Sequence, residues 1–287
     1  MQTIRSYLVV IEPQLMESLA LKRAKEIASI TQAHLHLLIS DKEHDHSALL
    51  DVLTGTLKNE GYSVTSRQAW HENLHTTIIK EQQIKGCGLV IKQHVDDSTL
   101  RKILLTPEDW KLLRDCPAPV LLVRTSQTWK NSVALAAIDV GNGEEAHMAL
   151  HKNIIDRGLR ITSLTHGELH VVSAHPAPTL AVMDATYPIE TEYEASYIAA
   201  SKEFQSRFDI SDERMHVKEG PADIIIQHVA KKLGATVTII GTVARTGLSA
   251  ALIGNTAEIL IDKLECDILV LKPDDIVEQL EQKAADA

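Results

Sequence analysis

The sequence predicts an α/β protein made of two tandem, doubly wound domains, each a five-stranded, Rossmann-like parallel sheet with helices on both faces. Its length of 287 residues suits two domains of about 140 residues each. Residues 7–12 and 134–139 are matching apolar runs that end in an acid, which is typical of strands buried on both faces of a parallel sheet. Each run precedes a long segment with helical spacing of apolar residues.

Further segments of the first half recur in the second half in the same order. The matched pairs are residues 31–38 with 165–172, 87–91 with 235–240, and 120–123 with 268–271. The spacing between partners grows along the chain, so the second half carries extra residues, mostly between 173 and 219. Each half therefore predicts five strands alternating with four helices, the order of a doubly wound sheet.

Local signals predict where elements and domains end. The polar segment 126–132 bridges the two copies, which predicts domains at residues 1–126 and 127–287. After Pro273 the sequence predicts a short helix, with Asp274 available as its N-cap. An apolar stripe at helical spacing predicts the first helix; it comprises Met16, Leu19, Ala20, Ala24 and Ile27.

The composition excludes several classes of protein. The formal net charge is −10 and no basic run is present, which argues against a nucleic-acid surface. No apolar stretch approaches the roughly 20 residues that span a bilayer, and the first residues lack the apolar region of a signal peptide. Three widely spaced cysteines without a CxxC pair indicate reduced thiols. We therefore expect a cytoplasmic protein that contacts neither nucleic acid nor membrane.

The second half contains residues suited to binding phosphate. Ligands of open parallel sheets bind beyond the carboxyl ends of the strands, where Asp139 and Gly241 follow two predicted strands. Small residues there allow backbone N–H groups to approach a phosphate, and a helix beginning near Gly254 adds its partial positive charge. Arg245 offers a bidentate cationic contact, and Asn255 and Thr256 offer caps or donors to phosphate oxygens. On spacing alone, a loop shaped only by chain geometry is an equal alternative.

The matching loop of the first half lacks the features that suit phosphate binding. Residues 92–100 contain no glycine and include two adjacent acids where a polyphosphate would lie. Pro107 suits the first turn of a helix capped by Thr106. The acids Glu108 and Asp109 complement the dipole of that helix in place of a phosphate. We therefore expect that the first half has lost nucleotide binding.

With these residues laid out, the chain resembles the universal stress protein family, in its tandem form, over nearly its full length. Nucleotide-binding members carry the pattern G-x2-G-x9-G-[S/T] after the fourth strand and an Asp closing the first strand. Gly241, Gly254 and Asp139 match, whereas Ala244 replaces the middle glycine and Asn255 replaces the Ser or Thr. The segment 106–114, with Cys116-Pro117 and Pro119-Val120, resembles the signature of a bacterial tandem branch of the family.

The resemblance implies a cytoplasmic stress-response protein that binds rather than catalyses. It implies that an adenine nucleotide such as ATP is held in the second half, with Asp139 reading the adenine or ribose edge. It also implies that the two halves pair through their last strands, and a homodimer of chains is a further expectation. Two alternatives stay open: a slow nucleotide hydrolase using the same cleft, or a carrier of another small molecule between the halves, lined by residues 180–183.

Other residue patterns favour structural roles. The cluster His44-Asp45-His46 is interpreted as a solvated loop rather than a metal site, because metal binding needs three or four converging ligands. His36 and His170 recur at matched strand positions and are interpreted as core or sheet-face residues. Cys116 precedes a proline near a strand and is interpreted as buried and structural. No G-x-S-x-G elbow and no other catalytic constellation is found.

Overall fold

The computed structural model describes residues 5–94, 106–175, 190–242 and 255–285. The first half contains β1 (Ser6–Val10), α1 (Leu19–Thr31), β2 (His34–Ile39), α2 (Ser47–Asn59), β3 (Val64–Gln68), α3 (Leu74–Lys85), β4 (Leu89–Gln93), α4 (Pro107–Asp115) and β5 (Val120–Val123). The second half contains β6 (Val133–Ile138), α5 (Glu145–Thr165), β7 (Glu168–His175), α6 (Glu190–Phe208), a 3₁₀ turn (Asp212–Arg214), β8 (Met215–Glu219), α7 (Ala222–Leu233), β9 (Ala235–Gly241), α8 (Asn255–Lys263), β10 (Asp267–Leu271) and α9 (Asp274–Ala285).

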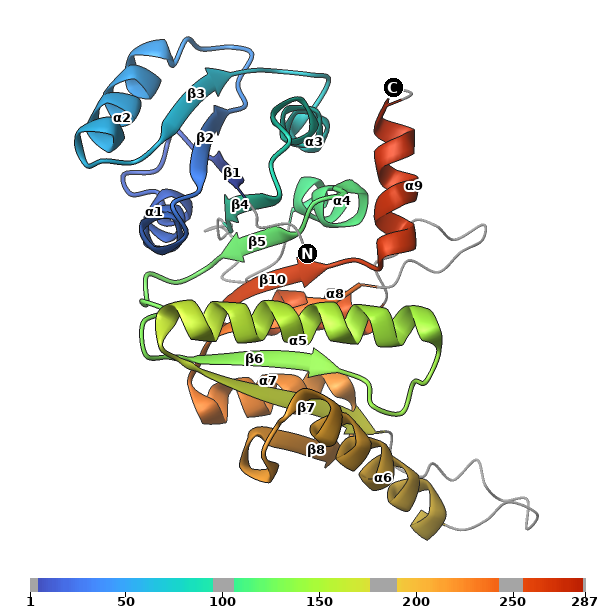
Figure 1. Cartoon of the computed structure of the whole chain (residues 1–287). Coiled ribbons are helices and arrows are strands. Elements are labelled where there is room, and N and C mark those ends of the chain that lie inside the picture. Colours follow the sequence, from blue (N-terminus) through green and yellow to red (C-terminus); the bar gives the residue numbers. More distant parts are fainter. Residues whose placement is uncertain (1–4, 95–105, 176–189, 243–254, 286–287) are drawn as a thin grey trace.

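One continuous sheet passes through both halves (Figure 1). Its strand order is β3-β2-β1-β4-β5-β10-β9-β6-β7-β8. Within each half the strands are parallel, with the first strand between the second and the fourth. Only the pair β5 and β10 is antiparallel among the described strands, with Leu121 opposite Leu269. The predicted fold class and the pairing of the last strands are both present, whereas the boundary after residue 126 stays a prediction.

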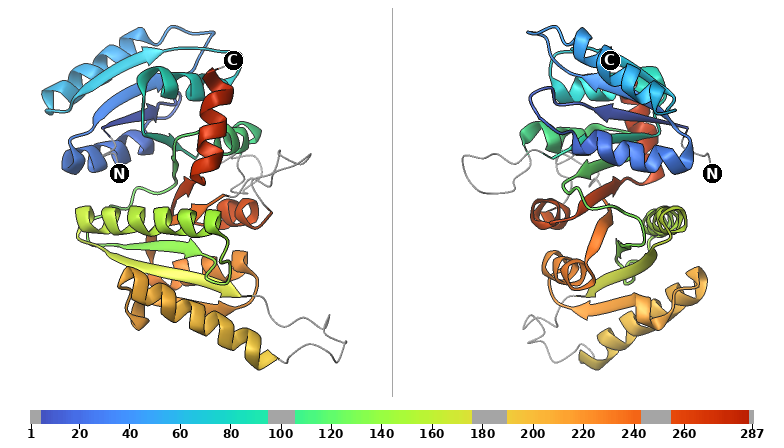
Figure 2. Two further views of the ribbon diagram at one scale, coloured as in Figure 1. Left: turned by 45° about the vertical axis from the view of Figure 1, so that its right-hand side comes forward. Right: turned by 90° about the vertical axis from the view of Figure 1, so that its left-hand side faces the viewer.

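Helices cover both faces of this sheet, as Figure 2 shows end-on. Buried side chains of α1, α2, α5 and α6 pack with one face, and those of α3, α4, α7 and α8 pack with the other. The inner strands of both halves are mostly buried, and β5 and β10 have every residue buried, whereas the edge strands β3 and β8 are only partly buried. This two-sided burial explains why the strands are continuous apolar runs rather than alternating ones. Among the described residues, no helix is both long and apolar enough to span a membrane.

Two predicted helix starts need correction, and one is confirmed. Helix α1 begins at Leu19 because the Ser18 side chain accepts the Leu21 N–H, so Met16 lies outside the helix and is fully exposed. Helix α9 begins at Asp274 itself, so this residue is a first-turn acid and not the N-cap. Thr106 caps α4 as predicted, and Asp109 completes a capping box by accepting the Thr106 N–H.

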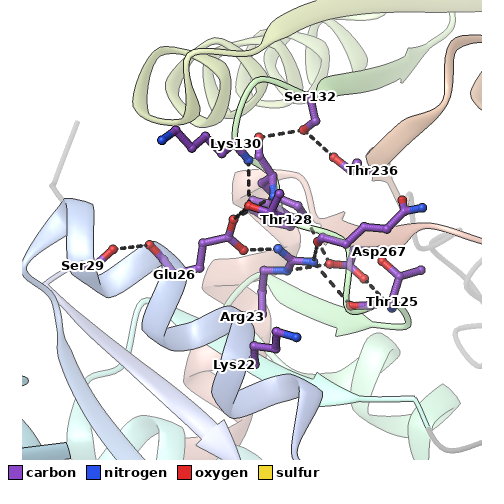
Figure 3. Close-up of polar contacts among 12 residues, drawn as sticks. Lys22, Arg23, Glu26, Ser29, Thr125, Thr128, Lys130, Ser132, Thr236 and Asp267 are labelled. Carbon is purple, nitrogen blue, oxygen red and sulfur yellow. Dashed lines mark hydrogen bonds and ion pairs between the residues drawn. The ribbon is translucent and has the colours of Figure 1, made fainter. Parts of the chain in front are cut away.

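The polar segment that joins the halves is packed into the molecule (Figure 3). Arg23 of α1 donates to the carboxylate of Asp267 at the start of β10. The indole N–H of Trp129 donates to the same carboxylate oxygen at 3.1 Å, and the Arg23 guanidinium lies over the Trp129 ring. Glu26 accepts hydrogen bonds from the Thr128 hydroxyl and the Trp129 N–H. The connection therefore holds α1 of the first half against β10 of the second.

Candidate functional site

The predicted nucleotide edge of the second half lies where β6 and β9 end. These strands are neighbours and parallel, so Asp139, which follows β6, and Gly241, which ends β9, are both at the carboxyl edge of the sheet. Asp139 is exposed to solvent, whereas Gly241 is half-buried. Two of the residues predicted for this site are therefore at neighbouring strand ends, the position where open parallel sheets bind ligands.

The backbone around Asp139 is held by buried polar side chains that the sequence did not single out. The Asp139 N–H donates to Nε2 of His151 at 3.3 Å, and the Val140 N–H donates to Oγ of Ser173 at 3.2 Å. The Asp139 carboxylate itself accepts the Gly141 N–H at 3.0 Å. Burial, and secondarily the nearby His147, lowers the pKa of His151 to about 4. The ring is therefore neutral at pH 7 and can accept the Asp139 hydrogen bond.

An aromatic side chain closes over the same turn. Tyr197 of α6 is buried, and its ring lies 5.3 Å from the ring of His175, centroid to centroid. A Cβ atom at Gly141 would approach Cζ of that Tyr197 ring to 2.2 Å. The sequence did not single out Gly141, and its aromatic neighbour Tyr197 is more than 50 residues away along the chain, so this contact could not be inferred.

Helix packing also explains why a glycine stands at position 241, in addition to the predicted phosphate binding. A Cβ atom on it would lie 2.5 Å from Cδ2 of Leu150 and 3.2 Å from Cδ1 of Ile154. Both side chains belong to α5 and are buried. The absence of a side chain at Gly241 thus allows α5 to pack onto the end of β9. A glycine at this position is therefore not by itself a sign of a ligand.

The remaining predicted site residues fall largely outside the described part of the chain. Ala244, Arg245 and Gly254 lie between residues 243 and 254, of which the structure says nothing. Asn255 and Thr256 are the first residues of α8, although their side chains are not described. The start of α8 is where a phosphate-binding helix was expected. The contributions of these five residues stay predictions.

The corresponding edge of the first half is filled by a buried ion network. Nζ of Lys92, on β4, lies 3.0 Å from Oδ1 of Asp109, on α4, and 3.3 Å from Oε1 of Glu12, which follows β1. Lys92 and Asp109 are almost fully buried. Burial alone would lower the pKa of Lys92, but Asp109 and Glu12 raise it. Lys92 thus places a positive charge between Glu12, which follows β1, and Asp109 in the first turn of α4.

A second concave site lies at the junction of the halves. A cavity of about 370 Å³ is lined by the first-half helix α1, the second-half helix α5 and strands β5 and β10. Its wall is mostly apolar and includes Leu121, Trp129 and Leu269, while Arg157 and Arg160 of α5 also line it. Burial, followed by repulsion from Arg160, lowers the pKa of Arg157. Within the described residues neither arginine makes a hydrogen bond or an ion pair.

The cysteines and two of the noted histidines have structural surroundings. Cys87, Cys116 and Cys266 are free and buried, and burial raises the pKa of Cys116 to about 11. A thiol with such a pKa is a poor nucleophile at neutral pH. His36 and His170 are half-buried on the sheet, as interpreted from the sequence, and each ring packs beside another histidine ring.

Comparison with known proteins decides the family. A model of the universal stress protein family matches residues 135–272. A universal stress protein E homolog of Haemophilus influenzae is 33% identical over 254 residues, covering 86% of this chain and 81% of the relative. The chain belongs to the universal stress protein family. Universal stress protein E of Photorhabdus laumondii is 29% identical, covering 96% of each chain.

Solved structures agree with this assignment. A Pseudomonas aeruginosa protein described as functionally unknown has 54% identity and a TM-score of 0.91, covering 99% of this chain and 98% of its own. A universal stress protein of Archaeoglobus fulgidus has 13% identity and a TM-score of 0.66, covering 94% and 99%, and so shares the fold. The universal stress protein assignment supports a role in the stress response, and members of this family are generally not enzymes.

Proposed function

We propose that this universal stress protein is a cytoplasmic binding and signalling module that holds an adenine nucleotide, such as ATP, in its second half. The difference between the two sheet edges carries the proposal. In the first half, Lys92 occupies the edge and is neutralised by Glu12 and Asp109. In the second half, Asp139 is exposed at the corresponding edge, so it remains available to a ligand. The first half then serves as the structural partner of the second.

The proposed nucleotide would be held by residues of different kinds. Asp139 would accept from the adenine or ribose edge, as its resemblance to the family's acid implies. Backbone N–H groups near Gly241, Ala244 and Gly254 would contact the phosphates, aided by the N-terminus of α8. Arg245 would add a cationic contact, and the side chains of Asn255 and Thr256 would add donors.

The decisive experiment identifies what the purified protein carries. Freshly purified chain is denatured, and the released small molecules are separated by chromatography and identified by mass spectrometry. ATP released in near-stoichiometric amount supports the proposal. A protein that releases no nucleotide and also fails to bind added ATP in calorimetry rules the nucleotide site out.

Matched variants distinguish the two halves. Asp139→Asn removes the charge at the second edge, and Glu12→Gln does the same at the first edge. We expect Asp139→Asn and Gly254→Val to weaken or abolish ATP binding. Glu12→Gln and substitutions at Asp96 and Asp97 should leave it unchanged. Equal losses from both sets would place the nucleotide outside the second half.

The same experiment addresses a hydrolase. ADP in place of ATP among the released molecules would favour slow hydrolysis in this cleft. Hydrolysis needs a group that positions water near the γ-phosphate. Among the described residues at this edge, no carboxylate is paired with a neighbouring base in a way that provides one. We therefore propose binding without catalysis.

The junction cavity supports a second candidate function, the carriage of a small amphipathic anion. Its apolar wall suits a hydrocarbon group, and Arg157 and Arg160 suit a carboxylate or phosphate group. Native mass spectrometry with added decanoate tests this candidate directly. Binding that is lost in Arg157→Gln/Arg160→Gln and retained in Asp139→Asn would support it. Binding that does not respond to the arginines would exclude this cavity.

Association of two chains is the remaining part of the proposal. The strands β5 and β10 pair within one chain, so a homodimer would have to use another surface. Light scattering coupled to size-exclusion chromatography measures the mass of the assembly. A mass twice that of the 31.7 kDa chain is the expected result, and a mass equal to one chain would contradict it.

A further inference from the structure

Three potential metal ligands converge in the loop between β2 and α2. This loop lies near the carboxyl edge of the first half of the sheet (Figure 1). Oδ2 of Asp41 lies 2.7 Å from Nε2 of His46 and 3.3 Å from Nδ1 of His44. All three ligand atoms lie within 4.8 Å of one another. The sequence drew attention to His44-Asp45-His46 and favoured a solvated loop, because nothing in the spacing indicated that Asp41 would fold back onto the two histidines.

The separations suit a small divalent cation. Zinc binds imidazole nitrogen and carboxylate oxygen at about 2.0–2.2 Å in tetrahedral geometry, so neighbouring ligand atoms lie about 3.3 Å apart. The separation of 3.3 Å equals this value, the separation of 2.7 Å is shorter, and the third is at most 4.8 Å. Small side-chain rotations would therefore place a cation between the three ligand atoms. Each ring would coordinate through its unprotonated nitrogen and carry its proton on the other one.

The loop is fixed before any cation binds. Oδ1 of Asp41 accepts the N–H groups of Glu43 and His44, which leaves Oδ2 facing the two rings. Gln68, at the end of β3, supports all three ligands through their backbone. Its Oε1 accepts the His46 N–H at 2.7 Å, and its Nε2 donates to the carbonyls of Asp41 and His44 at 3.0 and 2.6 Å. Such positioning lowers the ordering cost of binding.

We propose that Asp41, His44 and His46 form a zinc site with an open fourth position. Two imidazole nitrogens and one carboxylate favour zinc over magnesium, which prefers oxygen ligands only. The side chains of Asp41 and His46 are about one-fifth exposed, while that of His44 is 72% exposed. A cation can therefore enter from the side of His44, and the fourth position faces solvent. This site is independent of the nucleotide site, which the proposed function places in the other half.

The test uses the full-length chain without a polyhistidine tag. Titration calorimetry with zinc chloride should show one saturable site per chain, and excess magnesium chloride should not compete. Cobalt(II) should give the absorption spectrum of a tetrahedral site, which zinc then abolishes by displacement. Asp41→Asn, His44→Ala and His46→Ala should each weaken zinc binding by at least about tenfold. His44 is so exposed that His44→Ala will fold, which keeps the test valid if another variant does not.

Two further variants complete the test. Gln68→Ala removes a positioning residue, so zinc affinity should fall by about 10- to 100-fold while the bound cobalt keeps the same type of spectrum. His36→Ala is the matched control. His34 and His36 also form a histidine pair, but their rings bond to the hydroxyls of Ser63 and Thr65, and within the described residues no carboxylate bonds to either ring. His36→Ala should leave zinc binding unchanged. Absence of a saturable site, or equal binding by the native chain and His44→Ala, would overturn the proposal.

Discussion

Nε of Arg23 donates a hydrogen bond to Oδ2 of Asp267 at 2.8 Å, although the two residues lie in different halves of the molecule. Their side chains are 3% and 0% exposed. The other carboxylate oxygen accepts the backbone N–H groups of Arg124 and Thr125 at 2.8 and 3.1 Å. Asp267 thus bonds to the first helix, to the connecting segment and to the end of the first half's last strand, which makes it the polar centre of the junction.

Removal of one partner of this pair should be costly. Arg23→Met leaves the Asp267 carboxylate buried without its cation, so the free energy of unfolding should fall by about 3–5 kcal/mol. Chemical denaturation followed by circular dichroism measures the change. The double variant Arg23→Met/Asp267→Leu removes both charges and should recover part of the loss.

An exposed pair on α5 provides the control. Nζ of Lys152 lies 2.7 Å from Oδ2 of Asp156, but the Lys152 side chain is largely exposed. Lys152→Ala should therefore change stability by less than about 1 kcal/mol. If Arg23→Met cost no more than Lys152→Ala, the buried pair would not be holding the halves together.

The fold could be predicted from the sequence, but the junction could not. The continuous apolar runs at 7–12 and 134–139 are typical of buried parallel strands, so the local sequence pattern was sufficient to predict them. The Arg23–Asp267 bond joins residues that are 244 positions apart, and no local pattern reports such a contact. Trp129 illustrates the same limit, since it lies in a polar segment and is buried.

The candidate site was predicted only in part, for a similar reason. Asp139 and Gly241 follow strands, and strand topology alone places them at one edge. The support from His151, Ser173 and Tyr197 depends on how helices and neighbouring strands pack. Likewise, Asp41 joins His44 and His46 only because Gln68 of β3 fixes the loop. Residues that act through tertiary contacts have no periodic signal in the sequence.

Two glycines should respond to alanine in opposite directions. A Cβ atom at Gly167 would lie 2.2 Å from the backbone oxygen of Ser132, which cannot move without shifting β6 against β7. Gly167→Ala should destabilise the protein by about 1–3 kcal/mol. A Cβ atom at Gly55, inside α2, would meet nothing within 4 Å. Gly55→Ala should therefore stabilise by about 0.5–1 kcal/mol.

Thermal and chemical denaturation of both glycine variants checks this prediction. The comparison is internal, because each variant adds the same methyl group to the same chain. Loss of stability in Gly55→Ala, or none in Gly167→Ala, would show that the backbone relaxes differently from the contacts described.

Acid should weaken the protein through His151. Its pKa is about 4 in the folded chain and about 6.5 when unfolded. Between these values the unfolded chain binds a proton that the folded chain does not, so stability falls as the pH decreases from 6.5 towards 4. This residue should account for a loss of about 2 kcal/mol between pH 7 and pH 4.5.

The variant His151→Gln isolates that contribution. Glutamine can still accept the Asp139 N–H but does not titrate, so its stability should fall less steeply with acid. Burial also lowers the pKa of His36 to about 4, and the variant should therefore retain some acid sensitivity. Identical pH profiles for the native chain and His151→Gln would contradict the assignment.

Lys272 should make the stability of the protein rise with pH on the alkaline side. It follows β10, is almost fully buried, and Nζ donates to the carbonyl oxygen of Cys116 at 2.7 Å. Burial lowers its pKa to about 8, against partial opposition from Cys116 and Asp115. An unfolded lysine has a pKa of about 10.4. Between pH 8 and 10.4 the unfolded chain holds the extra proton, so the contribution of Lys272 to stability rises with pH.

Comparison with Lys272→Met separates this effect from the titration of other groups. Relative to the variant, the native chain should gain about 2 kcal/mol in unfolding free energy between pH 7.5 and pH 9.5. Chemical denaturation at both pH values measures the difference directly. If the free energy of unfolding changed equally with pH in both proteins, Lys272 would keep its proton at high pH, and its charge would be compensated within the fold. The expected divergence instead requires a buried ammonium group that is destabilising at neutral pH, because one carbonyl hydrogen bond does not replace its hydration.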